Sequence, residues 1–235
     1  MEVFYSKVSI VGVMLSLGEF QKRIAGFPKG YMDNFDYVWK WKIRVESNGH
    51  DHILDENHIR EAYDRLRNIL PKWQTYRNGD NSEPLKTLKE ALSNISDEYN
   101  QLRKYTLLEF ENIPRETLEK IWHELGRVKE KDGNRNSEGD YFIISVTKPL
   151  LLMWGATPAF DSKVRQHMPK NYDVPKYSCK WNLDTWTRIM RQISTELNND
   201  EDAKKLLDKT SKRLYGERAI VSYGRFLDIY YWKGR

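Results

Sequence analysis

The sequence predicts a mainly α-helical protein, organised as one domain of two helical lobes over residues 1–235. Apolar residues recur at a spacing near 3.6 along most of the chain, which is typical of helices with one buried face. Eight Trp and fourteen Tyr supply large apolar side chains for a core, although 31% of the residues are charged. No stretch has the composition of a linker, so a single domain is favoured over two independent ones.

The apolar spacing predicts six helices, and proline or glycine marks several of their ends. Their ranges are 59–70, 85–95, 114–125, 186–197, 203–214 and 219–232. Pro71 ends the first, Pro84 precedes the second, Pro114 opens the third and Gly126 follows it. Between the third and fourth, an apolar helix is predicted to start at Lys148.

Three stretches depart from the helical pattern. Residues 38–46 alternate apolar and basic side chains with a period of two, which predicts a short β element, although Phe35, Val38, Trp39 and Lys42 also fit a helix. Residues 78–83 and 129–139 are polar and glycine-rich and are predicted to be loops. The longest apolar run, residues 8–17, is far too short to cross a bilayer and is predicted to be a core segment.

Charge and cysteine content narrow the classes of partner and compartment. Residues 151–235 carry 16 basic and 10 acidic side chains, and such a cationic excess favours a polyanion, here DNA. The single cysteine, Cys179, cannot form an internal disulfide, which favours the cytoplasm. No motif predicts a metal site, a cofactor or a membrane segment, and a monomer is expected.

The segment 139–168 carries the chemistry. It places Lys148 before an apolar helix, then a turn containing Gly155 and Pro158, then Asp161 at the head of a new helix that continues through Ser162 and Val164. This order resembles the helix-hairpin-helix DNA glycosylase superfamily, over about 30 residues. In that superfamily a hairpin ending in lysine or glutamine precedes a stretch that supplies the catalytic aspartate.

The resemblance implies a DNA glycosylase with Asp161 as its catalytic carboxylate. Such a carboxylate stabilises the positive charge that builds on the sugar when an N-glycosidic bond breaks, and it orients the attacking water. Lys148 is the second catalytic candidate, since a lysine amine can attack C1′ and form a Schiff base. Lys148 precedes Asp161 by only 13 residues, closer than in typical members, so a monofunctional enzyme is favoured. The cleft is expected around residues 140–168.

A flipped base requires an aromatic pocket with a cationic rim. Tyr141, Trp154 and Phe160 are the predicted pocket residues, because they lie near Asp161 in the sequence. The predicted phosphate-binding residues are basic side chains of the same region, namely Lys163, Arg165, Lys176 and Lys180. The substrate is expected to be a damaged base, or a modified base of invading phage DNA.

Each of these assignments has a structural alternative. Asp161 fits a helix N-cap, Lys148 fits a solvated residue at a helix start, and Trp154 fits the core. The aromatic helix at 219–232 fits either a docking helix or a surface on which bases stack.

Two further readings compete with an enzyme. The chain could be a non-catalytic helical nucleic-acid-binding module, or a protein-interaction domain of a mobile element.

His50, Asp51, His52 and His58 could hold a divalent metal, but their polar setting favours an exposed loop.

Overall fold

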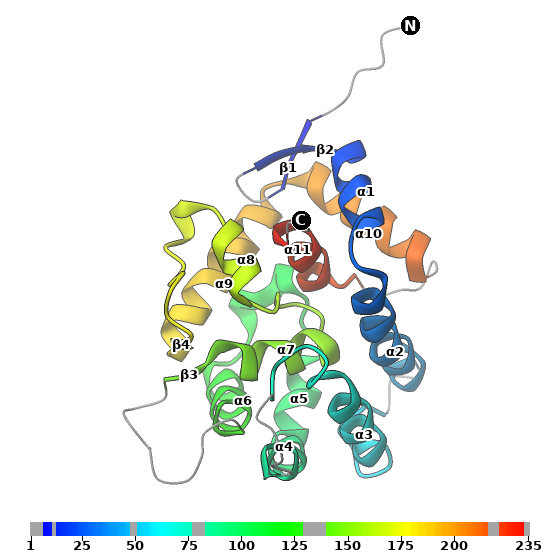
Figure 1. Ribbon diagram of the computed structural model, residues 1–235, viewed down its shortest axis with the longest axis vertical. Coiled ribbons are helices and arrows are strands. Elements are labelled where there is room, and N and C mark those ends of the chain that lie inside the picture. The colour runs from blue at the N-terminus through cyan, green and yellow to red at the C-terminus, as the bar shows by residue number, and fades with distance from the viewer. Residues whose placement is uncertain are drawn as a thin grey trace, which may run out of the picture.

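The computed structural model describes residues 7–10, 13–47, 51–76, 83–128, 140–215 and 221–232, and the side chains of residues 7–19, 21 and 83–85 are left aside. Within these residues the protein is mainly α-helical, as predicted (Figure 1). The first half contains β1 Lys7–Ile10, β2 Val13–Ser16, α1 Leu17–Ala25, α2 Lys29–Glu46, α3 Ile59–Ile69, α4 Glu83–Asn94, α5 Ser96–Leu102, the 3-10 helix η1 Leu107–Asn112 and α6 Arg115–Arg127. The second half contains β3 Tyr141–Phe142, α7 Ile143–Met153, α8 Ser162–His167, the 3-10 helix η2 Lys170–Tyr172, β4 Lys180–Trp181, α9 Leu183–Asn198, α10 Glu201–Tyr215 and α11 Tyr223–Tyr231.

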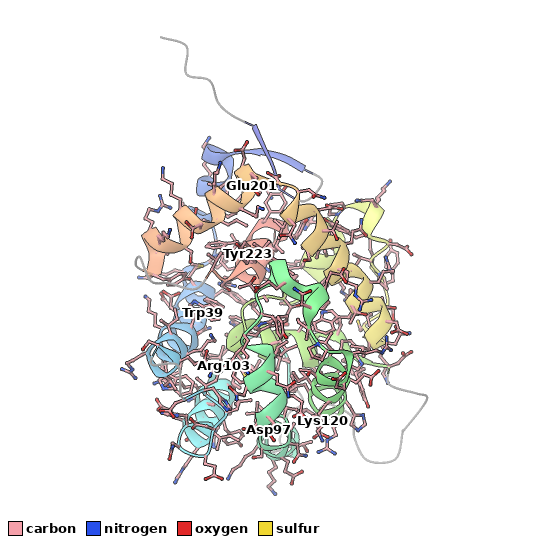
Figure 2. All side chains as sticks on the ribbon, turned by 180° about the vertical axis from the view of Figure 1, so that it is seen from behind. Trp39, Asp97, Arg103, Lys120, Glu201 and Tyr223 are labelled. Atoms are coloured by element: carbon pink, nitrogen blue, oxygen red, sulfur yellow. The ribbon has the colours of Figure 1, made fainter. Side chains whose placement is uncertain are left out.

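The helices α7 and α11 lie in the middle of the molecule, with the others arranged around them (Figure 1). Every described residue of α11 is buried, and α11 contacts both α1 and α8. One continuous apolar cluster extends from Phe20 to Tyr231. Side chains fill the space between the helices, as Figure 2 shows from behind, with Trp39 of α2 and Tyr223 of α11 labelled. The division into two lobes stays a prediction.

The predicted β element at residues 38–46 is wrong, because this stretch is the second half of α2. Phe35, Val38, Trp39 and Lys42 are buried on it, as their helical spacing allows. Lys42 is buried because its ammonium lies 2.8 Å from a Glu46 carboxylate oxygen and 4.7 Å from the centre of the Trp39 ring. The alternation of apolar and basic residues therefore does not reflect alternating burial.

Strands occur at two other places among the described residues. The apolar run near the N-terminus pairs β1 with β2 in an antiparallel hairpin, with Val8 opposite Leu15. The second sheet pairs Tyr141 with Trp181 and Phe142 with Lys180. This pairing joins the start of α7 to the start of α9, and so brackets the segment that contains Asp161. Most of the loop predicted at residues 78–83, and all of that at 129–139, lies outside the described residues.

Candidate functional site

Two residues in the left-handed region shape the connection between α7 and α8. Gly155 has φ +76°, and an added Cβ there would overlap the Trp39 side chain, so the turn requires glycine. Phe160 has φ 47° although it is a buried aromatic residue, and its ring packs 5.1 Å from that of Trp181. A strained conformation of this kind persists only where the surroundings hold it, and here it immediately precedes Asp161.

Asp161 caps α8. One carboxylate oxygen, Oδ1, accepts a hydrogen bond from the Val164 backbone N–H at 3.0 Å, which is the N-cap that the sequence predicts. The side chain is half-buried, and its other oxygen has no hydrogen-bond partner within the described part of the chain. The carboxylate is thus held at one oxygen, and Asp161 belongs to the lining of a pocket.

The C-terminal helix α11 fastens this connection at both ends. The Gly155 carbonyl accepts hydrogen bonds from the Ser222 hydroxyl at 3.0 Å and from the Gly224 N–H at 2.8 Å. Further along, the Ala159 N–H donates to Oδ1 of Asp228 at 3.1 Å. Residues on α11 therefore position the turn that presents Asp161.

A buried ion pair on α11 supports the same turn. The Arg225 guanidinium lies 3.1 Å from Oδ2 of Asp228, and it also donates to the Tyr31 carbonyl at 3.0 Å. Arg225 is 1% exposed, and its guanidinium lies 4.8 Å from the centre of the Phe27 ring. Burial raises the pKa of the Asp228 carboxyl to about 6, the Arg225 charge opposes this rise, and the nearby Asp161 charge adds to it.

A pocket of about 350 Å³ opens beside Asp161. This volume falls in the range of sites that bind small molecules or single bases. Aromatic residues from distant parts of the chain form its walls. Its lining consists of Phe27, Tyr31, Trp73, Gln74, Phe142, Ile143, Ile144, Lys148, Ala159, Asp161, Ser162, Lys163, Arg165, Cys179, Arg225, Asp228 and Trp232.

Lys148 lines the same pocket as Asp161. It does not stand at a solvated helix start, because α7 begins five residues earlier and Lys148 is 6% exposed inside it. Its ammonium donates a hydrogen bond to the Trp73 carbonyl. The structure therefore brings together the two catalytic candidates.

All three predicted pocket residues belong to the core, and none is part of the pocket lining. The Tyr141 hydroxyl lies 2.6 Å from Nδ1 of His123. The Trp154 indole donates to the Tyr105 carbonyl at 2.7 Å, in agreement with the alternative that it is a core residue. Phe160 is fully buried against Trp181. Proximity to Asp161 in the sequence does not translate into proximity to the pocket.

The predicted phosphate-binding residues divide into two groups. Lys163 and Arg165 line the pocket, whereas Lys176 and Lys180 do not. Arg165 is buried, and its guanidinium donates to the carbonyls of Pro175 and Ser178, so it anchors the following loop. Lys163 is exposed, and Lys180 lies 5.2 Å from the centre of the Phe142 ring, near the pocket wall.

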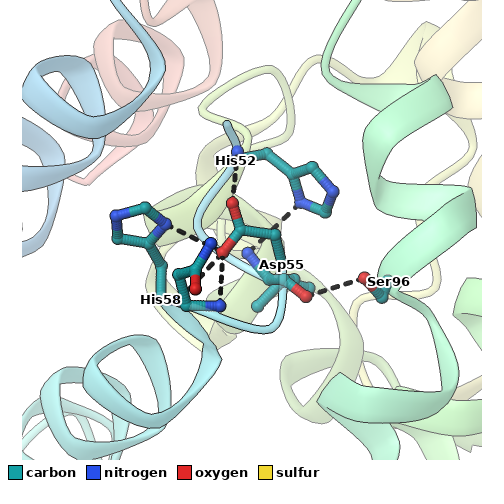
Figure 3. Close-up of polar contacts among 6 residues, drawn as sticks. His52, Asp55, His58 and Ser96 are labelled. Carbon is teal, nitrogen blue, oxygen red and sulfur yellow. Dashed lines mark hydrogen bonds and ion pairs between the residues drawn. The ribbon is translucent and has the colours of Figure 1, made fainter. Parts of the chain in front are cut away.

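The histidine-containing loop is tied to its own backbone (Figure 3). The Asp55 carboxylate accepts hydrogen bonds from the backbone N–H groups of His52, Asn57 and His58, and it lies 2.8 Å from Nδ1 of His58. His52 is buried, contrary to the prediction of an exposed loop, and burial lowers the pKa of its imidazole. Asp51, Asp55 and His58 lie close enough to share a cation. Their arrangement is explained by the turn that starts α3.

Comparison with protein-family models, with curated proteins and with solved structures found no match to this chain. None of the helices in the described ranges is both long and apolar enough to span a membrane.

No local pattern in the sequence marks most of the pocket walls. Phe27, Tyr31, Trp73 and Trp232 come from three distant segments, and only the aromatic content of residues 219–232 drew attention to the last. Asp228 lies among the aromatic residues of 219–232, and no local pattern marks it as a site residue. Its burial beside Asp161 arises from tertiary packing.

Proposed function

We propose that the protein is a DNA glycosylase that hydrolyses the N-glycosidic bond of a damaged or modified base flipped out of DNA. The observation that carries this proposal is the pocket beside Asp161, which has aromatic walls and also contains Lys148. A flipped base needs a recess of this kind, with flat apolar walls and polar groups at fixed positions. DNA repair and defence against phages with modified DNA are both compatible with this activity.

The proposed role of Asp161 follows from its two oxygens. The helix N-cap fixes one oxygen at Val164, so the orientation of the carboxylate is set before the substrate enters. The other oxygen is available to stabilise the cationic character that develops at C1′ as the base leaves, and to orient a water for attack on C1′. The water adds at C1′, its proton passes to the carboxylate, and the bonding electrons leave with the base.

The environment of Lys148 supports the monofunctional route. Its amine extends from α7 and donates to the Trp73 carbonyl, so this hydrogen bond would have to break before the amine could attack C1′. The ammonium of Lys148 adds positive charge to a lining that also contains the Asp161 and Asp228 carboxylates, and its charge opposes the rise in the pKa of Asp228. Lys163, Lys176 and Lys180 are the proposed phosphate contacts, while Arg165 holds the loop that carries Lys176.

The test compares Asp161→Asn with Asp173→Asn. Asparagine is also a good N-cap, so the first variant is expected to fold, and Asp173 is an exposed residue outside the pocket lining. Each protein is incubated with duplexes that carry single oxidised, alkylated, deaminated or hypermodified bases, and alkali then reveals abasic sites. We expect Asp161→Asn to lose at least about 100-fold in rate while binding DNA normally, and Asp173→Asn to retain the wild-type rate.

Two results would contradict the proposal. Unchanged base release by Asp161→Asn would remove the carboxylate from the reaction. DNA binding without release of any base would leave the non-catalytic nucleic-acid-binding module as the function. Trapping of a covalent adduct with borohydride would replace the monofunctional route by one through Lys148.

A further inference from the structure

The charges around the pocket indicate which class of base it accepts. Among the described residues of the lining, four side chains are cationic and two are anionic. The cations are Lys148, Lys163, Arg165 and Arg225, and the anions are Asp161 and Asp228. Since Arg225 and Asp228 pair with each other, the remaining charges of the lining are three cations and one anion, Asp161. The pocket therefore has a positive potential.

The aromatic walls already carry cations of the protein itself. The Lys163 ammonium lies 3.8 Å from the centre of the Trp232 ring. The Arg225 guanidinium lies 4.8 Å from the centre of the Phe27 ring and 5.7 Å from that of Trp73. A cationic ligand gains binding energy from an aromatic wall when it lies over the electron-rich face of the ring. Cations of the protein already lie near the rings of Trp232, Phe27 and Trp73, so these faces are partly occupied.

The hydrogen-bonding groups of the pocket favour ligands that present acceptors. Lys148 and Lys163 bring N–H donors to the lining, with Lys148 already donating to the Trp73 carbonyl, and Gln74 brings an amide NH2 donor and an amide oxygen acceptor. Both oxygens of Asp228 are engaged, one by the Ala159 N–H and the other by Arg225. The second oxygen of Asp161 is reserved for the sugar if the proposed reaction is correct. Donors therefore outnumber the acceptors that remain for a base.

We infer that the pocket selects uncharged bases that carry carbonyl oxygens, and discriminates against N-alkylated bases, which are cations. The inference rests on the proposed function and specifies its substrate class. A neutral carbonyl-bearing base satisfies the donors and stacks on the walls without opposing their cations. A cationic base meets like charge at Lys148 and Lys163, which costs affinity.

The test measures affinity for duplexes of one sequence that carry hypoxanthine, 8-oxoguanine or N7-methylguanine. Each lesion is placed on a 2′-fluoro sugar, which stabilises the glycosidic bond, so binding is measured without base release. We expect the two neutral bases to bind about tenfold more tightly than the cationic one. In Lys163→Glu this ratio is expected to fall by about threefold, because the side chain is exposed and its field is partly screened.

Lys170→Glu is the matched control. Lys170 is an exposed lysine of the same region that does not line the pocket, so its reversal is expected to weaken all three complexes equally. Equal or tighter binding of the cationic base by the wild type would overturn the inference, and so would an unchanged ratio in Lys163→Glu. With ordinary sugars, release of N7-methylguanine alone would overturn the inference and support a glycosylase. A neutral-base preference without any base release would contradict the proposed enzyme and leave the charge selectivity standing.

Discussion

Replacing Arg225 by methionine tests whether the buried ion pair on α11 holds the pocket together. Methionine is apolar and reaches about as far as the aliphatic part of arginine, but the substitution leaves the Asp228 carboxylate buried without its cation. It also removes the bond to the Tyr31 carbonyl and the contact with the Phe27 ring. Breaking a buried pair from one side costs about 3–5 kcal/mol of the free energy of unfolding, because one charge remains uncompensated.

Urea denaturation followed by tryptophan fluorescence measures this loss at pH 5 and at pH 8. Without Arg225 the pKa of Asp228 rises further above its unfolded value. The folded variant therefore keeps the Asp228 carboxyl protonated at pH 5. At pH 8 the carboxyl is charged in the unfolded state, so the free energy of unfolding of the variant decreases. The deficit relative to wild type is therefore expected to grow as pH rises. Arg191→Met removes an exposed pair with Glu111 and is expected to cost less than about 1 kcal/mol at either pH. An Arg225→Met deficit no larger than that control, or one independent of pH, would refute the reasoning.

Three further predictions concern other parts of the structure. Asp228→Asn removes a carboxyl whose folded pKa, about 6, lies above its unfolded value. The stability that the bound proton contributes to the wild type is therefore present below about pH 4 and is lost as pH rises through 6. The free energy of unfolding of Asp228→Asn should rise relative to wild type by up to about 3 kcal/mol between pH 4 and pH 7, and a difference that stays constant in urea denaturation would contradict this. Gly126→Ala should cost about 1–3 kcal/mol because its Cβ would overlap the Tyr141 ring, whereas Gly30→Ala, with nothing within 4 Å, should not destabilise, and both are measured by thermal unfolding. Asp55→Ala should lower the free energy of unfolding by about 1–2 kcal/mol, because the hydrogen bonds from three backbone N–H groups are lost. Zn²⁺ should leave the Tm of the wild-type protein unchanged, and a rise in Tm would show that the loop binds metal.

Local sequence patterns predicted most helices because each carries its own apolar stripe. Leu118, Ile121, Trp122 and Leu125 are buried on α6, as their spacing indicates. The same rule misplaced the start of α7, since that helix is buried all round and shows no polar face to mark its beginning. A start at Lys148 would place Pro149 in the first turn, where proline is tolerated, but Pro149 lies inside α7.

The candidate site was predictable only at the residues that follow one another along the chain. The N-cap position of Asp161 is a local feature and was anticipated from Ser162 and Val164. The pocket walls are not local, because Phe27 and Trp73 reach Asp161 through contacts with α11. No spacing rule relates these positions, so sequence neighbours such as Trp154 were chosen in their place.

The contribution of α11 determines when the site can form during synthesis. Its residues fasten both ends of the turn before Asp161, and Trp232 completes one wall. While these residues are still inside the ribosomal tunnel, the emerging chain has Asp161 but lacks the groups that orient it. The nascent protein is therefore expected to lack the proposed activity until residue 232 has left the ribosome, however early the other helices have folded.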